Sequence, residues 1–462
     1  MNELTPPRVD PEKNGLKLFN EASHSMDSGL GVLDRNVPPA MRTVVPGKAM
    51  VGWRQGEIVS EYGSGFITNS WADIEQALKS QSPCLALLQQ AGEFPFLDFE
   101  LDYKQGFSMP LPHLIKMKRA AVLLSSAAID ALHRNDSFAA VTNVHTLLAL
   151  QSAWKNEPTL ISQLVRIAMA QITANAQWEL LQATNLTDAQ LALLQRDWMD
   201  LEFVRPMENA LVFERGWSSV TIQQLRTSNS PSAMFAAFSA ATSSGGGSVG
   251  WLGNFGQIAK RKTSDTLWRV SWSYSDELAA LKGDEVLVET VRQVRTNDYF
   301  KDALLERDRK LTALGLDHPG TNWLRDELDD ALTILGVESV NSVGHSLDRL
   351  LTTEAVRRMA VTGIALKRYR LRHAAWPADL DALVPEFLPQ VPRDPVDGHM
   401  LRYHWNPDGT FLLYCIGKDG VDNGGDPAPD GPIKSWLRSR DWVWPQPASP
   451  ADIQNYYSNP PK

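Results

Sequence analysis

The chain has 462 residues, which suffices for about two to four domains at the usual ~100–200 residues each. Its 45 basic and 54 acidic residues give a formal charge of −9, which argues against a general nucleic-acid-binding protein because phosphate binding needs a basic surface. Two cysteines, Cys84 and Cys415, exclude a disulfide-rich scaffold and a cysteine-based zinc module, and the sequence leaves open whether they pair.

Residues 1–50 are rich in proline, asparagine and glycine, which predicts an extended segment with one short helix over 11–27. The first ten residues lack a basic region and an apolar core, so we expect no signal peptide. No window approaches about 18 consecutive apolar residues, which predicts no membrane-spanning helix. We expect a cytoplasmic protein if the chain is full length and an extracytoplasmic one if an N-terminal anchor has been removed.

Residues 51–340 are predicted to form a helical domain. Capping-box spacing at Ser70 and Asp73 starts one helix, and at Thr187 and Gln190 another. Between 113 and 228, apolar residues recur at helical spacing with short turns, which predicts a stack of antiparallel helical hairpins. Such a stack also suits a scaffold that binds peptides. The predicted helices span about 70–88, 113–134, 136–156, 158–176, 187–200, 206–226, 283–316 and 321–336.

Residues 98–103 alternate acidic and apolar side chains, which predicts a strand. On such a strand the carboxylates of Asp98, Glu100 and Asp102 would share one face about 6.6 Å apart, a separation used by inverting glycosidases. The alternative function is therefore a carbohydrate-active or glycan-binding protein. The structural interpretation is an edge strand whose charges deter aggregation.

Residues 242–250 are rich in glycine and serine, which predicts a flexible loop, and no phosphate-binding Lys-Ser/Thr pair follows its glycines. Three nearby tryptophans could line a groove in the glycan-binding alternative, although tryptophans more often belong to a core. These tryptophans are Trp251, Trp268 and Trp272. Residues 344–348 resemble a nucleophile elbow but lack its second glycine. Because no catalytic signature is complete, we expect a protein that is not an enzyme.

The C-terminal part begins with a predicted helix from Thr352 or Thr353 to His373. Strands are predicted over 401–405 and 410–416, because Asn406-Pro-Asp-Gly409 between them is a strong hairpin turn. A loop of glycine and aspartate follows, from 417 to 426.

This loop has the composition of a calcium site. Calcium takes six to eight oxygen ligands, largely carboxylates and carbonyls on a tight turn. The candidate ligands are Asp419, Asp422, Asn423 and Asp426, with the Gly417 carbonyl and either Asp430 or Asp441 as additional ligands. Glycines at 420, 424 and 425 let the backbone turn its carbonyls inwards. The alternative is a polar surface turn without an ion.

The same region resembles the C-terminal part of the major pseudopilin of type II secretion systems. The resemblance covers about 351–445, roughly a fifth of the chain. The matching residues are Tyr369 to His373 with Trp376-Pro377, Leu383 to Pro385, Pro392 to Pro395 with Gly398, and Gly417 to Gly420 with Gly424-Gly425. The resemblance implies a small α+β module over 341–462, a calcium-associated loop and an extracytoplasmic setting. The whole chain also looks like uncharacterised bacterial envelope proteins that join a helical region to such a module.

The chain departs from pseudopilins in two respects. About 350 residues precede the module instead of an apolar helix that packs into a filament, and Ala374-Ala375 replaces the usual glycine turn. The resemblance therefore implies a fold and an ion site rather than membership in a filament. We expect a mainly α protein of antiparallel hairpins with a pseudopilin-like C-terminal module, acting as a non-catalytic envelope interaction or structural protein with a protein partner.

Overall fold

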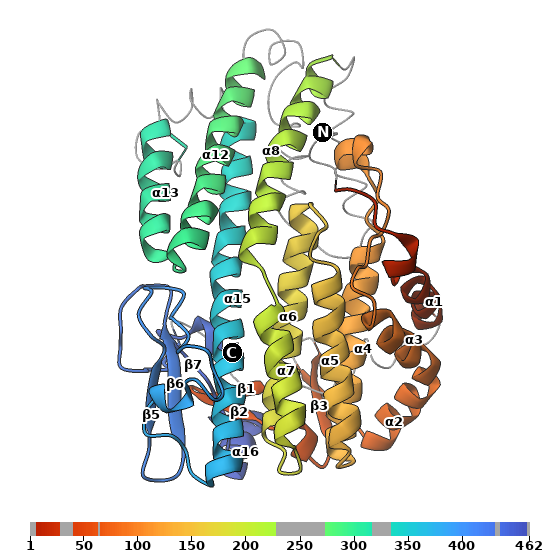
Figure 1. Cartoon of the computed structure of the whole chain (residues 1–462), viewed down its shortest axis with the longest axis vertical. Coiled ribbons are helices and arrows are strands. Elements are labelled where there is room, and N and C mark those ends of the chain that lie inside the picture. The colour runs from red at the N-terminus through yellow and green to blue at the C-terminus, as the bar shows by residue number, and fades with distance from the viewer. Residues whose placement is uncertain are drawn as a thin grey trace.

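The computed structural model describes residues 6–27, 40–62, 65–227, 273–316, 334–429 and 435–459. These residues are mainly helical, with three small sheets, as Figure 1 shows. The predicted glycine- and serine-rich loop at 242–250 and the three tryptophans Trp251, Trp268 and Trp272 lie outside the described residues. No described helix is both long and apolar enough to cross a membrane.

The predicted helices of 113–228 are confirmed. The first three pack on one another in succession, whereas the fourth packs on the second and the fifth on the third. Thr187 begins one of them with the expected capping box, since its hydroxyl accepts from the N–H of Gln190 (3.2 Å). The helices are α4 (His113–His133), α5 (Ser137–Ala153), α6 (Leu160–Leu181), α7 (Asp188–Asp200) and α8 (Val204–Thr227).

Two predicted helices are each interrupted. Ser70 caps α2 (Trp71–Ser80) as expected, but this helix stops before Gln81, and a separate helix, α3 (Ser82–Gly92), follows. The break falls here because a proline stands in the first turn of α3, where a new helix starts readily. The predicted helix 283–316 is likewise two helices, α12 (Ser273–Asn297) and α13 (Lys301–Leu314). Asp298 between them has a positive φ of 65°, which a continuous right-handed helix does not accommodate. Of the predicted helix 321–336, only residues 334–336 are described.

The long helix α15 (Ile334–His373) runs through the middle of the molecule and packs on α6, α7 and α12. The predicted start at Thr352 or Thr353 is wrong. Both hydroxyls instead donate to carbonyls one turn earlier, at Asp348 and Arg349 (2.8 Å each), as threonines inside helices do. Position 341 lies within α15, and the division of the chain into domains stays a prediction.

Helix α15 ends in a left-handed residue that is not glycine. Ala374 has a φ of 56°, and its N–H donates to the Arg370 carbonyl (2.9 Å). A Cβ atom is unfavourable in this conformation, so Ala374→Gly is expected to raise the free energy of unfolding by about 1 kcal/mol in urea titrations. Ala375→Gly is the control, because φ is not positive there. Equal effects of the two substitutions would contradict the prediction.

Three small antiparallel or mixed sheets complete the fold. The predicted hairpin around Asn406–Gly409 is confirmed, and its second strand also pairs with a strand that the sequence did not indicate. The sheets have the orders β1-β2-β8, β3-β4 and β5-β6-β7, with β2 and β8 parallel. The strands are β1 (Arg42–Val45), β2 (Lys48–Met50), β3 (Ile58–Tyr62), β4 (Gly65–Asn69), β5 (Arg402–Trp405), β6 (Phe411–Ile416), β7 (Asp441–Val443) and β8 (Gln446–Pro447).

The two ends of the described chain flank the helical body. The predicted N-terminal helix is confirmed as α1 (Leu16–Asp27), which packs on α3. At the other end, β8 pairs with β2, and α16 (Pro450–Ser458) packs on β1. Residues 42–50 thus contribute two strands that the sequence does not predict, and a strand 398 residues after Lys48 completes their sheet.

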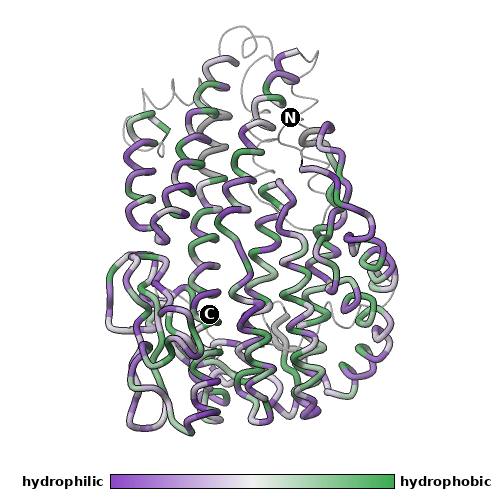
Figure 2. The backbone as a smooth tube through the Cα atoms, viewed as in Figure 1, coloured by the Kyte–Doolittle hydropathy of each residue, from purple (hydrophilic) through white to green (hydrophobic). Residues whose placement is uncertain are grey.

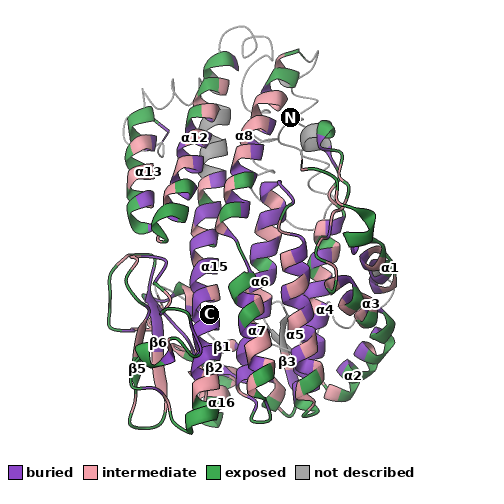
Figure 3. Cartoon of the chain, viewed as in Figure 1, coloured by how far each residue is buried: buried purple, intermediate pink, exposed green. Residues whose placement is uncertain are grey.

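The main core is shared between the helices and the C-terminal sheet. Purple, buried positions follow the facing sides of α4, α5, α6 and α15 in Figure 3, and Figure 2 shows apolar residues in the same places. Leu413 and Cys415 of β6 belong to the same apolar cluster as Leu366 of α15. A second apolar cluster joins α1, α2 and α3 to α4 and α5. The C-terminal sheet is thus seated on the helical body.

Candidate functional site

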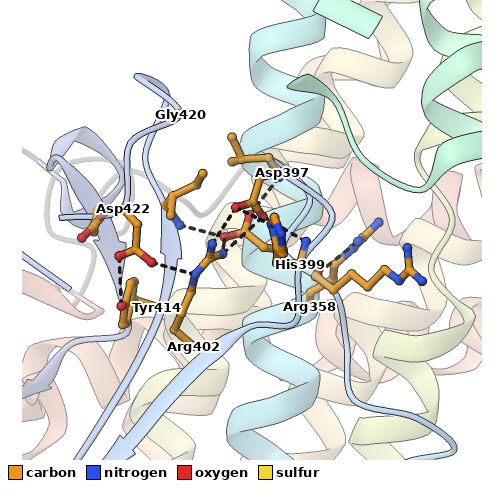
Figure 4. A network of polar contacts seen from close by, with 12 residues as sticks. Arg358, Asp397, His399, Arg402, Tyr414, Gly420 and Asp422 are labelled. Carbon is orange, nitrogen blue, oxygen red and sulfur yellow. Dashed lines mark hydrogen bonds and ion pairs between the residues drawn. The ribbon is translucent and has the colours of Figure 1, made fainter. Parts of the chain in front are cut away.

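A cluster of charged side chains lies at the start of β5 (Figure 4). Arg402 points from β5 toward the carboxylates of Asp394, Asp397 and Asp422. Its Nη2 atom is 2.6 Å from Asp397 Oδ2, its Nε atom is 3.2 Å from Asp422 Oδ2, and Nη1 bonds Asp394. We call these four residues the Arg402 cluster. One guanidinium thus forms ion pairs with three carboxylates, two from the segment before β5 and one from the loop 417–426.

Burial sets the protonation of this cluster. Asp394 is fully buried, and this burial raises its pKa to about 6, although N–H donors at Val396 and Ile416 and the charge of Arg402 lower it. Burial also acts to raise the pKa of Asp397, but the hydrogen bonds from Arg402 bring it below its usual range. At neutral pH the three carboxylates are therefore ionised, and the cluster carries a surplus of negative charge.

The loop 417–426 is folded around another buried carboxylate. Asp441 of β7 accepts the N–H groups of Gly425 (2.7 Å), Asp426 (3.1 Å) and Asn423 (3.1 Å). The backbone can curl this tightly because φ is positive at Gly424 and Gly425, at 71° and 80°. A Cβ atom at 425 would lie 2.7 Å from a Leu412 methyl group, so space also requires glycine there. Asp441 is thus the anchor of the loop.

The four predicted calcium ligands lie on this loop but face different partners. Asp419 accepts from the N–H of Val421 (3.0 Å), and the Asn423 side-chain amide donates to the Val421 carbonyl (3.1 Å). Asp422 accepts from the Gly424 N–H (2.9 Å) besides Arg402.

Of the remaining predicted ligands, Asp426 accepts from the Ala428 N–H (2.9 Å) and pairs with Arg440 (3.2 Å). The Gly417 carbonyl accepts from the Gly420 N–H (3.1 Å), and Asp430 lies outside the described residues. Within the described ranges, no three histidine, cysteine or acidic side chains are arranged to hold a metal ion. The donor types suit calcium, but their present directions do not converge.

The loop also contacts the helical body. Lys418 Nζ lies 2.7 Å from Asp348 Oδ2 on α15, and Lys301 Nζ of α13 lies 3.4 Å from the Gly420 carbonyl. The loop therefore joins the small sheet to two helices.

The segment that carries Asp394 is fixed to the same helices. The N–H groups of Phe300 and Lys301 donate to the carbonyls of Pro395 (2.8 Å) and Val396 (2.9 Å). Figure 4 shows Arg358 of α15 beside the Arg402 cluster. Arg358 donates to the Arg393 carbonyl (3.0 Å) and pairs with Asp298 (2.6 Å). Sequence reasoning missed the Arg402 cluster, because it depends on the chain folding back between 392 and 401.

The predicted acidic strand at 98–103 is wrong. Glu100 has a φ of 55°, and Asp98 accepts the Glu100 N–H (2.9 Å) in a local turn. Asp102 accepts the Lys104 N–H (3.2 Å) at the start of a short 3-10 helix. Aspartates that bond their own backbone favour turns over strands, so these carboxylates do not form the proposed catalytic face.

The remaining candidates have structural positions. Residues 344–348 lie inside α15 rather than on a strand-to-helix turn. Cys84 and Cys415 are both buried and free. In comparisons with known proteins, no family model, no curated protein and no solved structure matches the chain.

Proposed function

We propose that the chain is a non-catalytic interaction or structural protein of the cell envelope, whose pseudopilin-like C-terminal module is stabilised by calcium at the loop 417–426. In this proposal the chain acts through a protein partner in an extracytoplasmic setting, where free calcium is high enough to fill weak sites. The module would present its loop beside the α12–α13 turn, where the loop already contacts two helices. This position suits a role in joining the module to other protein surfaces.

One observation carries the proposal: in the Arg402 cluster three carboxylates share one guanidinium. Asp422, a predicted calcium ligand, is one of the three. Charge in a half-buried site is screened less than at an open surface, so the surplus negative charge attracts a cation. Among the described residues, Asp422 has no second cationic partner, and its other donors are neutral groups of Tyr414 and Gly424.

Calcium would take oxygens from Asp419, Asp422, Asn423 and Asp426, together with carbonyls of the loop. The glycines of the loop permit such carbonyls to turn inwards. Asp422 and Asp426 would have to release Arg402 and Arg440, and weak binding is the expected consequence. Calcium would then stabilise the native state by mass action, because it binds the loop in the folded chain and not in the unfolded chain.

Thermal unfolding in EDTA and in millimolar calcium tests the proposal. Binding to the native state is expected to raise Tm by about 1–3 °C in calcium. The double variant Asp419→Ala/Asp422→Ala is expected to show no rise. Magnesium at the same concentration is expected to have a smaller effect, because it loses its water reluctantly.

Asp408→Ala is the matched control. Asp408 lies in the same module and, like Asp419, is exposed and accepts an N–H two residues ahead (Thr410, 2.9 Å). This variant is expected to keep the full calcium response. A wild-type protein without a shift, or a double variant with the wild-type shift, would overturn the calcium site.

A further inference from the structure

A second group of buried carboxyl groups lies away from the loop, between α8 and α12. Glu214 of α8 and Asp284 of α12 are 8% and 5% exposed. One Glu214 oxygen accepts the N–H of Leu160, the first residue of α6 (3.0 Å). The Oδ2 atom of Asp284 is buried and has no hydrogen-bond partner among the described residues. This interface therefore contains an unsatisfied acid beside a second acid.

Among the described residues, the elements around this pair supply it with little positive charge. The cation that acts on Asp284 is Arg215 of α8, which is already paired with Glu285 at the surface. Glu157, in the segment before α6, already has its own partners, because it accepts from His113 Nε2 (2.9 Å) and from a tryptophan N–H (2.7 Å). Helix α15, on the adjoining face of α12, contributes apolar side chains such as Val343 and Leu347 to the core there.

Both carboxyl groups hold protons unusually well. Burial, assisted by the charge of Asp284, raises the pKa of Glu214 to about 7, although the hydrogen bond from the Leu160 N–H lowers it. Burial likewise raises the pKa of Asp284 to about 7, although Arg215 lowers it. In the unfolded chain these groups lose their protons near 4.5 and 3.8. Their contribution to stability is therefore complete below about pH 4 and is lost as the pH rises through about 7.

We propose that Glu214 and Asp284 form a proton-linked switch, which tightens the packing of α8 on α12 when they are protonated and loosens it when both are ionised. Two ionised carboxylates in this interface repel each other, and the Asp284 carboxylate has lost its water without gaining a donor. Loosening begins beside Phe213 and Trp217, the α8 residues of a small apolar cluster. This inference is independent of the calcium site.

Hydrogen exchange measured by mass spectrometry between pH 5.5 and 8.5, with labelling times corrected for the intrinsic rate, tests the switch in the intact chain. We expect corrected exchange in α8 and α12 to accelerate at least about tenfold over this range, which corresponds to one pKa unit of linkage. Peptides from α4 and α5 are the internal reference and are expected to change less. A wild-type protein with equal pH dependence in all four helices would overturn the proposal.

Uncharged variants test whether the pH dependence of exchange comes from Glu214 and Asp284. Glu214→Gln and Asp284→Asn imitate the protonated forms and are each expected to reduce the pH dependence, while the double variant removes it. Glu208→Gln is the matched control, because Glu208 joins the same two helices through surface pairs with Arg292 and Arg295 (2.9 Å each). It is expected to keep the wild-type pH dependence. A double variant that also keeps it would overturn the switch.

Discussion

Asp441→Ala is expected to lower the free energy of unfolding by about 3 kcal/mol, because it leaves three backbone N–H groups of the loop without an acceptor. Those groups belong to Asn423, Gly425 and Asp426, and Asp441 itself is fully buried. Urea unfolding measures the loss. Hydrogen exchange is expected to place it in the loop 417–426 and in β7.

Asp419→Ala is the control for this prediction. Asp419 lies on the same loop, but its carboxylate is exposed and accepts one local N–H. Its removal is expected to change the free energy of unfolding by less than about 0.5 kcal/mol in EDTA. If the two alanine variants were equally stable, Asp441 would not be the anchor of the loop.

Glu179→Ala is expected to have a comparable effect where the N-terminal strands meet α6, with a loss of about 3 kcal/mol. Glu179 is buried in α6, and its Oε1 atom accepts the N–H groups of Met41 and Gly52 (2.8 Å each). These bonds attach the β1–β2 hairpin to the helical body. Urea unfolding measures the loss, and limited proteolysis is expected to cut near the hairpin in the variant before the wild type.

Glu179→Gln separates the hydrogen bonds from the charge. The amide keeps one acceptor oxygen for the N–H groups of Met41 and Gly52, so this variant is expected to lose less stability than alanine. Burial raises the pKa of Glu179 to about 8, although its backbone donors lower it, and a neutral side chain is therefore tolerated. Equal losses in the two variants would contradict the attachment by hydrogen bonds.

Features that depend on nearby residues were predictable from the sequence. The capping boxes at Ser70 and Thr187 need only a partner three residues ahead, and the hairpin at Asn406–Gly409 needs only its own turn. The mainly helical class follows from apolar spacing within each helix in the same way.

Features that depend on distant partners were not predictable. Strand β2 pairs with β8, which lies far along the chain: Lys48 is opposite Gln446, 398 residues later. The error at 98–103 has a local cause, since alternation suits a strand but the aspartates bond their own backbone instead.

The candidate site was predictable in composition but not in geometry. The aspartates and glycines of 417–426 do form a tight loop, as their types indicate. The sequence suggested Asp441 as an extra calcium ligand, whereas its carboxylate accepts backbone N–H groups. Arg402 could not be identified as the cation at Asp422, because β5 and the loop 417–426 meet only in the folded chain.

Calorimetric titration of calcium into the intact protein tests the central claim most directly. The account predicts one calcium ion per chain, bound with a Kd of about 10⁻⁴–10⁻³ M, as is usual for extracellular sites. Asp419→Ala/Asp422→Ala is expected to give no binding heat, and Asp408→Ala the wild-type heat. The absence of binding heat in the wild type at millimolar calcium, after treatment with EDTA, would contradict the account and leave the loop held by Asp441 alone.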